Sequence, residues 1–285
     1  MKFNQLKLNF RHCLGALTLF CPLLLTAQTM NSVPNDPHLW LEEVQGEKAL
    51  AWVRERNAVS TSQLQALPVF SDNRAKVLAV LDNRDQIPSF SRRGDFFYTF
   101  WSDAKNPRGI LSRTTLIEYR KAQPQWDVLL DLDALAKAEG ENWVWGGSNC
   151  LAPDYNRCLI SVSRGGADAK VIREFDIAKR EFVKDGFFLP EAKSQTAWID
   201  LNTLYVGTDF GPGSMTKSGY TRIIKIWKRG TPLSEAAQVF EGMDSDVSTF
   251  VNVDKTPGFE RITVGRSIDF YNNEIQLLNS VFYFT

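Results

Sequence analysis

The feature that most constrains the fold is a repeated pattern of short apolar runs separated by turns, which begins after Pro88. The runs have strand length and are bounded by Gly, Pro, Asn and Asp, which is typical of antiparallel sheets. New groups of runs begin near Asp95, Trp143, Thr196 and Ser248. A restart about every 50 residues is typical of propeller blades, each of which is a four-stranded sheet. The sequence therefore predicts a mainly β chain with an incomplete β-propeller of about three and a half blades.

The segment before this pattern, residues 28–82, has helical periodicity instead. Asp36 and Pro37 are favourable residues for the start of a helical region. Pro68 separates this region from a second helix that we expect over residues 71–81. The predicted organisation is a short helical N-terminal segment followed by the propeller over residues 83–285.

The first residues have the properties of a signal peptide. Three basic residues precede an apolar run from Leu14 to Leu25, which is too short to span a bilayer. Small residues near Ala27 would permit cleavage there, so we expect residues 1–27 to be removed. A retained lipid anchor on Cys21 is the weaker alternative, because Phe20 is too large for the position before a lipidated cysteine. We expect an exported protein, periplasmic or secreted, that is not attached to a membrane after cleavage.

The charges argue against one class of partner. Lys and Arg together number 33, and Asp and Glu together also number 33. A chain with equal numbers of positive and negative side chains lacks the excess positive charge that is typical of nucleic-acid binding, so we expect no nucleic-acid partner.

Two of the four cysteines lie in the β region. Cys150 and Cys158 flank a turn-rich segment between two apolar runs, and a hairpin there would place them opposite each other. An oxidising compartment would favour a disulfide between them. Two small buried thiols on neighbouring strands are an equal alternative at this point.

Ordered motifs along the chain are similar to those of one known family. Asp36 begins the segment Asp-Pro-His-Leu-Trp-Leu-Glu, which is similar to that family's N-terminal Asp-Pro-Tyr-x-Trp-Leu-Glu. Residues 161–169 and Arg173-Glu-Phe-Asp resemble its second blade, and residues 204–233 resemble its third. Over residues 36–278 the chain thus resembles the prolyl oligopeptidase family of serine peptidases.

The resemblance implies a function and also a missing part. In that family a seven-bladed propeller covers an α/β-hydrolase domain that carries a Ser–Asp–His triad, and the helical segment packs on the hydrolase domain. By resemblance, this chain is the non-catalytic propeller part of a serine-type endopeptidase, and oligopeptide substrates would be processed only through a hydrolase domain. The final residues, 280–285, do not resemble the family's continuation, so we expect a frameshift or truncation there.

The alternative is a binding module rather than part of a peptidase. A partial propeller has an open sheet edge, through which it could pair with itself or with a separate hydrolase chain. Either way, we predict that this chain alone is inactive.

Two residues merit consideration as catalytic groups. Ser148 lies in Gly-Gly-Ser-Asn, similar to the setting of the family's nucleophile, but Cys150 replaces the Gly that a nucleophile elbow requires. A turn inside a β-run follows Ser148, where an elbow would be followed by a helix. His38 lies where the family has an aromatic residue without a catalytic role. We therefore predict no catalytic residue in this chain.

The sequence gives equally little support for a ligand site. Asp131–Asp133 and Asp244–Asp246 could bind a cation, but they lack the spacing of an EF-hand, and solvated turns are the favoured interpretation. Arg164 and Arg173 could line the channel and attract peptide carboxylates, although charges on strand edges are favoured. We expect no cofactor and no metal ion.

Overall fold

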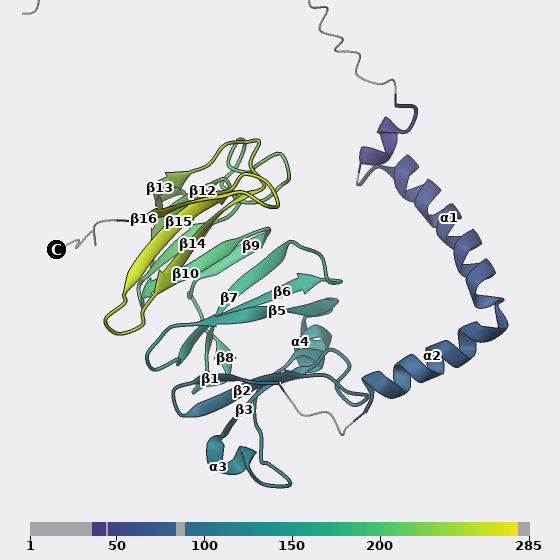
Figure 1. Ribbon diagram of the computed structural model, residues 1–285, viewed down its shortest axis with the longest axis horizontal. Helices are drawn as coiled ribbons and strands as arrows, with labels where there is room; N and C mark the ends of the chain where they lie inside the picture. Colours follow the sequence, from purple (N-terminus) through teal and green to yellow (C-terminus); the bar gives the residue numbers. More distant parts are fainter. Residues whose placement is uncertain (1–35, 44, 84–88, 279–285) are drawn as a thin grey trace, which may run out of the picture. The chain divides into compact units, whose positions relative to one another are not determined.

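The computed structural model describes residues 36–43, 45–83 and 89–278 (Figure 1). The chain divides into two compact units between Asp72 and Asn73. The predicted signal peptide, residues 1–27, and the segment 280–285 lie outside the described residues. Of the helices within the described ranges, none combines the length and the apolar character needed to cross a membrane.

The N-terminal unit is helical, as its periodicity predicted. It contains the 3-10 helix η1 (Leu39–Glu42) and the helix α1 (Glu47–Gln65). The rings of Trp40 and Trp52 meet edge to face at 6.2 Å and join the two helices. A further helix, α2 (Pro68–Leu81), crosses the division between the units. It begins at Pro68, three residues before the predicted start. Proline is well suited to the first position of a helix, because the N–H that it lacks would make no intrahelical hydrogen bond there.

The second unit is built from antiparallel sheets. Its described residues form four sheets with sixteen strands, and in each sheet the strands follow one another largely in chain order. The sheets are named here in chain order. The first comprises β1 (Ser91–Arg93), β2 (Phe96–Trp101), β3 (Ile110–Thr115) and β4 (Asp127–Asp131); the second β5 (Trp143–Cys150), β6 (Arg157–Arg164), β7 (Lys170–Asp176), β8 (Glu181–Phe182) and β9 (Phe188–Ala192); the third β10 (Gln195–Asp200), β11 (Thr203–Gly207), β12 (Ile223–Lys228) and β13 (Ala237–Glu241); the fourth β14 (Ser248–Asp254), β15 (Arg261–Ser267) and β16 (Asn273–Leu277).

The repeat predicted from the sequence is confirmed, with two strands added. The strand β1 is three residues long and polar, and β9 contains Pro190 and pairs with β7 beside β8. Neither has the sustained apolar run by which the other strands are found in the sequence. Two short helices interrupt the first repeat: α3 (Leu116–Tyr119) and α4 (Leu132–Glu139).

The apolar core lies between successive sheets (Figure 1). Because side chains alternate across a strand, each sheet sends one set of residues to the preceding sheet and the other to the following one. On β6, Ile160 packs against the first sheet and Leu159 against the third. On β11, Leu204 faces the second sheet and Tyr205 the fourth. The second and third sheets are therefore covered on both faces.

A buried ion pair joins the second and third sheets. The Glu174 side chain, on β7, is 1% exposed and accepts hydrogen bonds from both terminal nitrogens of Arg229, at 2.7 and 3.0 Å. The Phe187 backbone N–H donates to the same carboxylate at 2.9 Å. Arg157 lies 3.9 Å away and hydrogen-bonds Asp176. A carboxylate buried this deeply is tolerated only when it is paired and hydrogen-bonded.

We expect Arg229→Met to destabilise the chain by about 3–5 kcal/mol, because it leaves the Glu174 carboxylate buried without its main partner. Urea unfolding followed by circular dichroism measures the change. Arg261→Met is the matched control, since Arg261 pairs with Asp254 on an exposed surface, at 3.3 Å, and should leave the midpoint unchanged.

The double variant Glu174→Gln with Arg229→Met should recover part of the loss, because the amide still accepts from Phe187 and no charge stays buried. Equal midpoints for Arg229→Met and Arg261→Met would contradict this account of the ion pair.

Candidate functional site

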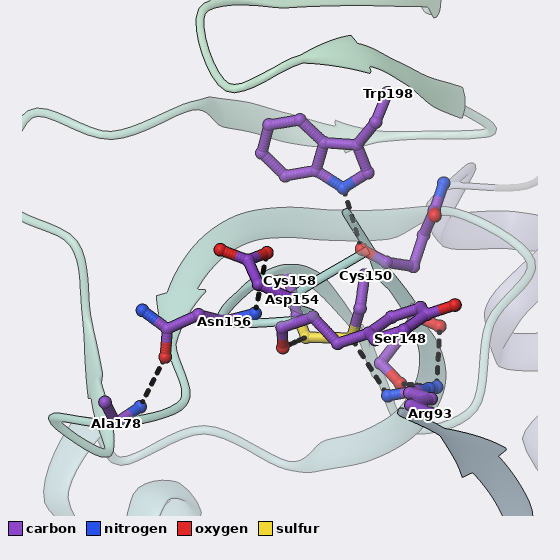
Figure 2. Close-up of a disulfide and its surroundings, with 10 residues drawn as sticks. Arg93, Ser148, Cys150, Asp154, Asn156, Cys158, Ala178 and Trp198 are labelled. Atoms are coloured by element: carbon purple, nitrogen blue, oxygen red, sulfur yellow. Dashed lines mark hydrogen bonds between the residues drawn. A yellow bond between two sulfur atoms is a disulfide. The ribbon is translucent and has the colours of Figure 1, made fainter. Parts of the chain in front are cut away.

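The hairpin between β5 and β6 brings the two cysteines of the β region together. The strand register places Cys150 directly opposite Cys158, and the structure joins them in a disulfide. The bond closes a turn of residues 151–156, here called the hairpin turn. Asn156 ties this turn to the segment after β7, because its side-chain oxygen accepts from the Ala178 N–H at 3.0 Å (Figure 2). The two sulfurs differ in environment: Cys158 is 0% exposed within the core between the first two sheets, whereas Cys150 is half-buried.

A guanidinium from the first sheet lies against this disulfide. Arg93, on β1, donates one hydrogen bond to the Cys150 sulfur at 2.9 Å and another to the Ser148 hydroxyl at 2.9 Å (Figure 2). Its guanidinium also lies 4.9 Å from the centre of the Tyr98 ring. Burial lowers the pKa of Arg93, and the neighbouring Tyr98 and Tyr155 act in the opposite direction. The group stays charged, since arginine does not deprotonate in proteins.

The same hairpin contacts the third sheet through side-chain to backbone hydrogen bonds. The Trp198 indole N–H donates to the Asn149 carbonyl at 2.9 Å (Figure 2). The Asn149 amide in turn donates to the Thr196 carbonyl at 2.9 Å. Further along, the Gln195 amide donates to the Thr249 carbonyl at 2.9 Å. The first strands of the second, third and fourth sheets are thus joined across the sheet boundaries.

A recess of about 480 Å³ opens beside the disulfide. Its walls come from β5, the hairpin turn, β10, β14 and residues 255–257, so three sheets contribute to it. Cys150, Tyr155, Trp198 and Lys255 are among the residues that line it. The Lys255 ammonium donates to the Ile199 carbonyl at 2.6 Å, and burial lowers its pKa. The recess therefore reaches Cys150, one of the two residues of the disulfide.

The structure places the two catalytic candidates in separate units. Ser148 lies inside β5, opposite Ile160, and a turn and a strand follow it where a nucleophile elbow would have a helix. Its hydroxyl accepts from Arg93, and within its own unit the described residues include no histidine. His38 is exposed in the N-terminal unit, where its backbone N–H donates to Asp36. Neither residue is in the setting of a triad member.

The aspartate pairs have structural partners. Asp131 caps α4 by accepting from the Ala134 N–H at 2.9 Å, and Asp133 accepts from the Arg108 N–H at 3.0 Å. Asp246 is buried, accepts from the Met243 N–H and pairs with Arg266. Within the described ranges, no group of three or more His, Cys, Asp or Glu could hold a metal ion.

The two candidate channel arginines are neutralised by glutamates. Arg164 pairs with Glu141 and Glu191, and Arg173 pairs with Glu139. They lie on β6 and β7, the second and third strands of their sheet. Their charges are therefore paired with nearby carboxylates.

Comparison with known proteins decides the family. The sequence model described as "Prolyl oligopeptidase, N-terminal beta-propeller domain" matches residues 26–280. The chain belongs to the prolyl oligopeptidase family. The four sheets described above are accordingly blades of that family's propeller, and the mainly β, propeller fold predicted from the sequence is confirmed.

Two curated relatives of this family are similar over most of the chain. An uncharacterized peptidase of Sinorhizobium fredii is 43% identical over 266 residues, which are 89% of this chain and 36% of the relative. An uncharacterized peptidase of Rickettsia prowazekii is 33% identical over 255 residues, which are 85% of this chain and 35% of the relative. The chain therefore spans about a third of the length of these prolyl oligopeptidase relatives.

Solved structures of the family have the same fold. A post-proline cleaving enzyme from Rickettsia typhi matches with a TM-score of 0.75 and 30% identity, over 85% of this chain and 38% of that one. Oligopeptidase B from Leishmania major matches with a TM-score of 0.57 and 15% identity, over 85% of this chain and 32% of that one. The second likeness concerns the fold alone.

We predict that the Cys150–Cys158 bond forms in the purified chain. Trypsin cleaves after Arg157 and so separates the cysteines onto peptides 138–157 and 158–164. Without reduction, mass spectrometry should find these peptides as one linked species that separates on reduction. Two alkylated, unlinked peptides from protein blocked before digestion would instead identify two buried free thiols.

Proposed function

We propose that this chain is the propeller part of a prolyl-oligopeptidase-type serine endopeptidase. In the complete protein the propeller would admit short peptides to a hydrolase domain, which would cleave them through an acyl-enzyme intermediate. As the more specific form of this proposal, cleavage would follow proline residues. The single observation that carries the proposal is the match of the N-terminal propeller model to nearly the whole chain. The Rickettsia typhi structure, named as a post-proline cleaving enzyme, supports the choice of substrate class.

We further propose that this chain alone does not hydrolyse peptides. Acyl transfer by a serine peptidase needs a nucleophile, a base within hydrogen-bond reach of it, and oxyanion donors. Ser148 is the one serine in a family-like Gly-Gly-Ser-Asn setting, and its hydroxyl is held by Arg93, a permanently charged donor that does not act as a base. The observed contacts of Ser148 thus support a structural role.

The alternative function, a propeller that associates with itself or with a separate hydrolase chain, is favoured by the surface of the fourth sheet. The Phe270 and Tyr271 side chains are 91% and 92% exposed at the turn between β15 and β16. Every residue of β16 is exposed, including Ile275 and Leu277, and among the described residues no strand pairs with its outer edge. Adjacent exposed apolar residues at an unpaired strand edge favour association.

Export is also part of the proposal. We propose that residues 1–27 direct the chain out of the cytoplasm to the periplasm or the medium, and the prediction of a Cys150–Cys158 disulfide is in keeping with such a compartment. N-terminal sequencing of the mature protein tests this: a start near Gln28 supports it, and a start at Met1 or a lipidated Cys21 overturns it.

We expect the purified chain to show no cleavage of a chromogenic proline-containing peptide and no labelling by a serine-directed fluorophosphonate, because the Ser148 hydroxyl accepts from Arg93, which does not act as a base. A full-length active serine peptidase serves as the positive control. Labelling of this chain that Ser148→Ala abolishes would show that Ser148 is a nucleophile and would refute the proposal.

If the alternative function holds, light scattering after size exclusion should give a defined dimer. The double variant Phe270→Ser with Tyr271→Ser should then shift the chain to a monomer, because it removes exposed apolar area at the edge of the fourth sheet. Ile117→Ser is the control, since Ile117 is also apolar and is 77% exposed but lies on α3, between β3 and β4. A monomeric parent chain would rule out self-pairing.

A further inference from the structure

We propose that Cys150–Cys158 is a redox-active disulfide, reduced by low-molecular-weight thiols, and that Cys150 is its reactive sulfur. The inference does not depend on the peptidase proposal. It rests on the contact between Arg93 and the Cys150 sulfur, on the unequal burial of the two sulfurs and on the recess beside them.

The first step in the argument is an unbalanced charge. Among the residues that the structure describes, no carboxylate forms an ion pair with Arg93, whose partners are the Cys150 sulfur, Ser148 and the Tyr98 ring. A partly buried cation without a counter-ion is stabilised electrostatically when one of its neighbours becomes an anion. Reduction of the disulfide provides that anion as a Cys150 thiolate, at hydrogen-bond distance from the guanidinium.

The second step is the asymmetry of the pair. An adjacent arginine lowers the pKa of a cysteine thiol, whereas burial among apolar groups raises it. Cys158 is fully buried in the core between the first two sheets and its sulfur contacts the Tyr155 carbonyl at 3.9 Å. The reduced pair therefore consists of a Cys150 thiolate and a protonated Cys158 thiol.

The other ionisable groups near Cys150 do not reverse this preference. Tyr98 on β2 and Tyr155 on the hairpin turn lie near Arg93 and bring no carboxylate to the sulfur. Lys255 also lines the recess and adds positive charge. Asp154 is exposed on the hairpin turn, where it accepts from the Asn156 N–H. Solvent screens this carboxylate more than it screens the partly buried Arg93.

The recess gives the attacking thiol its route. A thiolate RS⁻ entering from the recess attacks the Cys150 sulfur, the bond between the two sulfurs breaks, and Cys158 leaves and takes up a proton. A second RS⁻ attacks the sulfur of the added thiol, which releases RSSR and the Cys150 thiolate. Overall, the disulfide and two RSH yield one protein thiolate, one protein thiol, RSSR and one proton. Two electrons pass from the two small thiols to the protein disulfide.

The test uses the purified chain in buffers of reduced and oxidised glutathione at pH 7. After acid quenching and alkylation, the tryptic peptides 138–157 and 158–164 report the reduced fraction and the site of any mixed disulfide. We expect partial reduction within the glutathione range and the mixed disulfide on Cys150. Replacing Arg93 should shift the equilibrium about tenfold toward the disulfide, because it removes the cation that stabilises the Cys150 thiolate.

Arg93→Met removes the charge, Arg93→Lys keeps it, and Arg92→Met is the matched control on the exposed neighbouring position of the same strand. In the reduced protein, the pH midpoint of iodoacetamide reaction at Cys150 should lie at least about one unit below 8.5, should rise in Arg93→Met and should stay low in Arg92→Met. The lysine variant, with its charge retained, should lie between the parent and Arg93→Met. Circular dichroism verifies that each variant is folded.

Three results would overturn the proposal. The first is a disulfide that stays oxidised throughout the glutathione series. The second is a Cys150 midpoint at or above about 8.5, or one that Arg93→Met does not raise. The third is a mixed disulfide located on Cys158. Each can be observed without any peptidase activity, so the fate of the peptidase proposal does not affect the outcome.

Discussion

The structure depends on the fact that a single propeller sheet cannot cover its own two faces. Side chains alternate across each strand, and here both sets on the central strands are apolar. Ile160 and Leu159 on β6 point to different neighbouring sheets, and so do Leu204 and Tyr205 on β11. Each sheet is therefore stable only against the next, as in other architectures built from repeats. The β-unit is accordingly a stack with three inter-sheet cores, in which the middle sheets are best protected.

Polar contacts specify how the stacked sheets are aligned. Apolar packing alone tolerates sliding, whereas a buried charge or a directed hydrogen bond has one satisfactory geometry. The pair of Glu174 with Arg229 sets the second sheet against the third, and Trp198 with Asn149 does so at their first strands. Arg93 likewise joins the first and second sheets through a polar contact, but its partner is a disulfide sulfur. Under the redox proposal, the strength of this inter-sheet contact changes with the oxidation state of the disulfide.

Local pattern was sufficient to predict much of this fold. The apolar runs of β6 and β11 and the turn residues between strands follow from neighbouring residues, so the sequence predicts them. Polar β1 and proline-containing β9 lack such runs and become strands only by pairing with a neighbour. Arg93 is 57 residues from Cys150, and Arg229 is 55 residues from Glu174. Such partners are joined by the stacking of sheets, so neither spacing nor residue type indicates them. The cysteines were predicted to be opposite each other because a hairpin is local, whereas the contact of Cys150 with Arg93 depends on the stacking of the first two sheets.

Hydrogen–deuterium exchange of the unmodified chain, followed by mass spectrometry, tests the dependence of each sheet on its neighbours most directly. Exchange from folded sheets requires local opening, which is costly where both faces are covered and easy where one is bare. The account predicts the slowest exchange in β6 and β11, each packed between two sheets, and the fastest in β16, where every residue is exposed. If the amides of β16 were as protected from exchange as those of β6 and β11, the account would be contradicted. Covering by neighbouring sheets would then not be the source of stability.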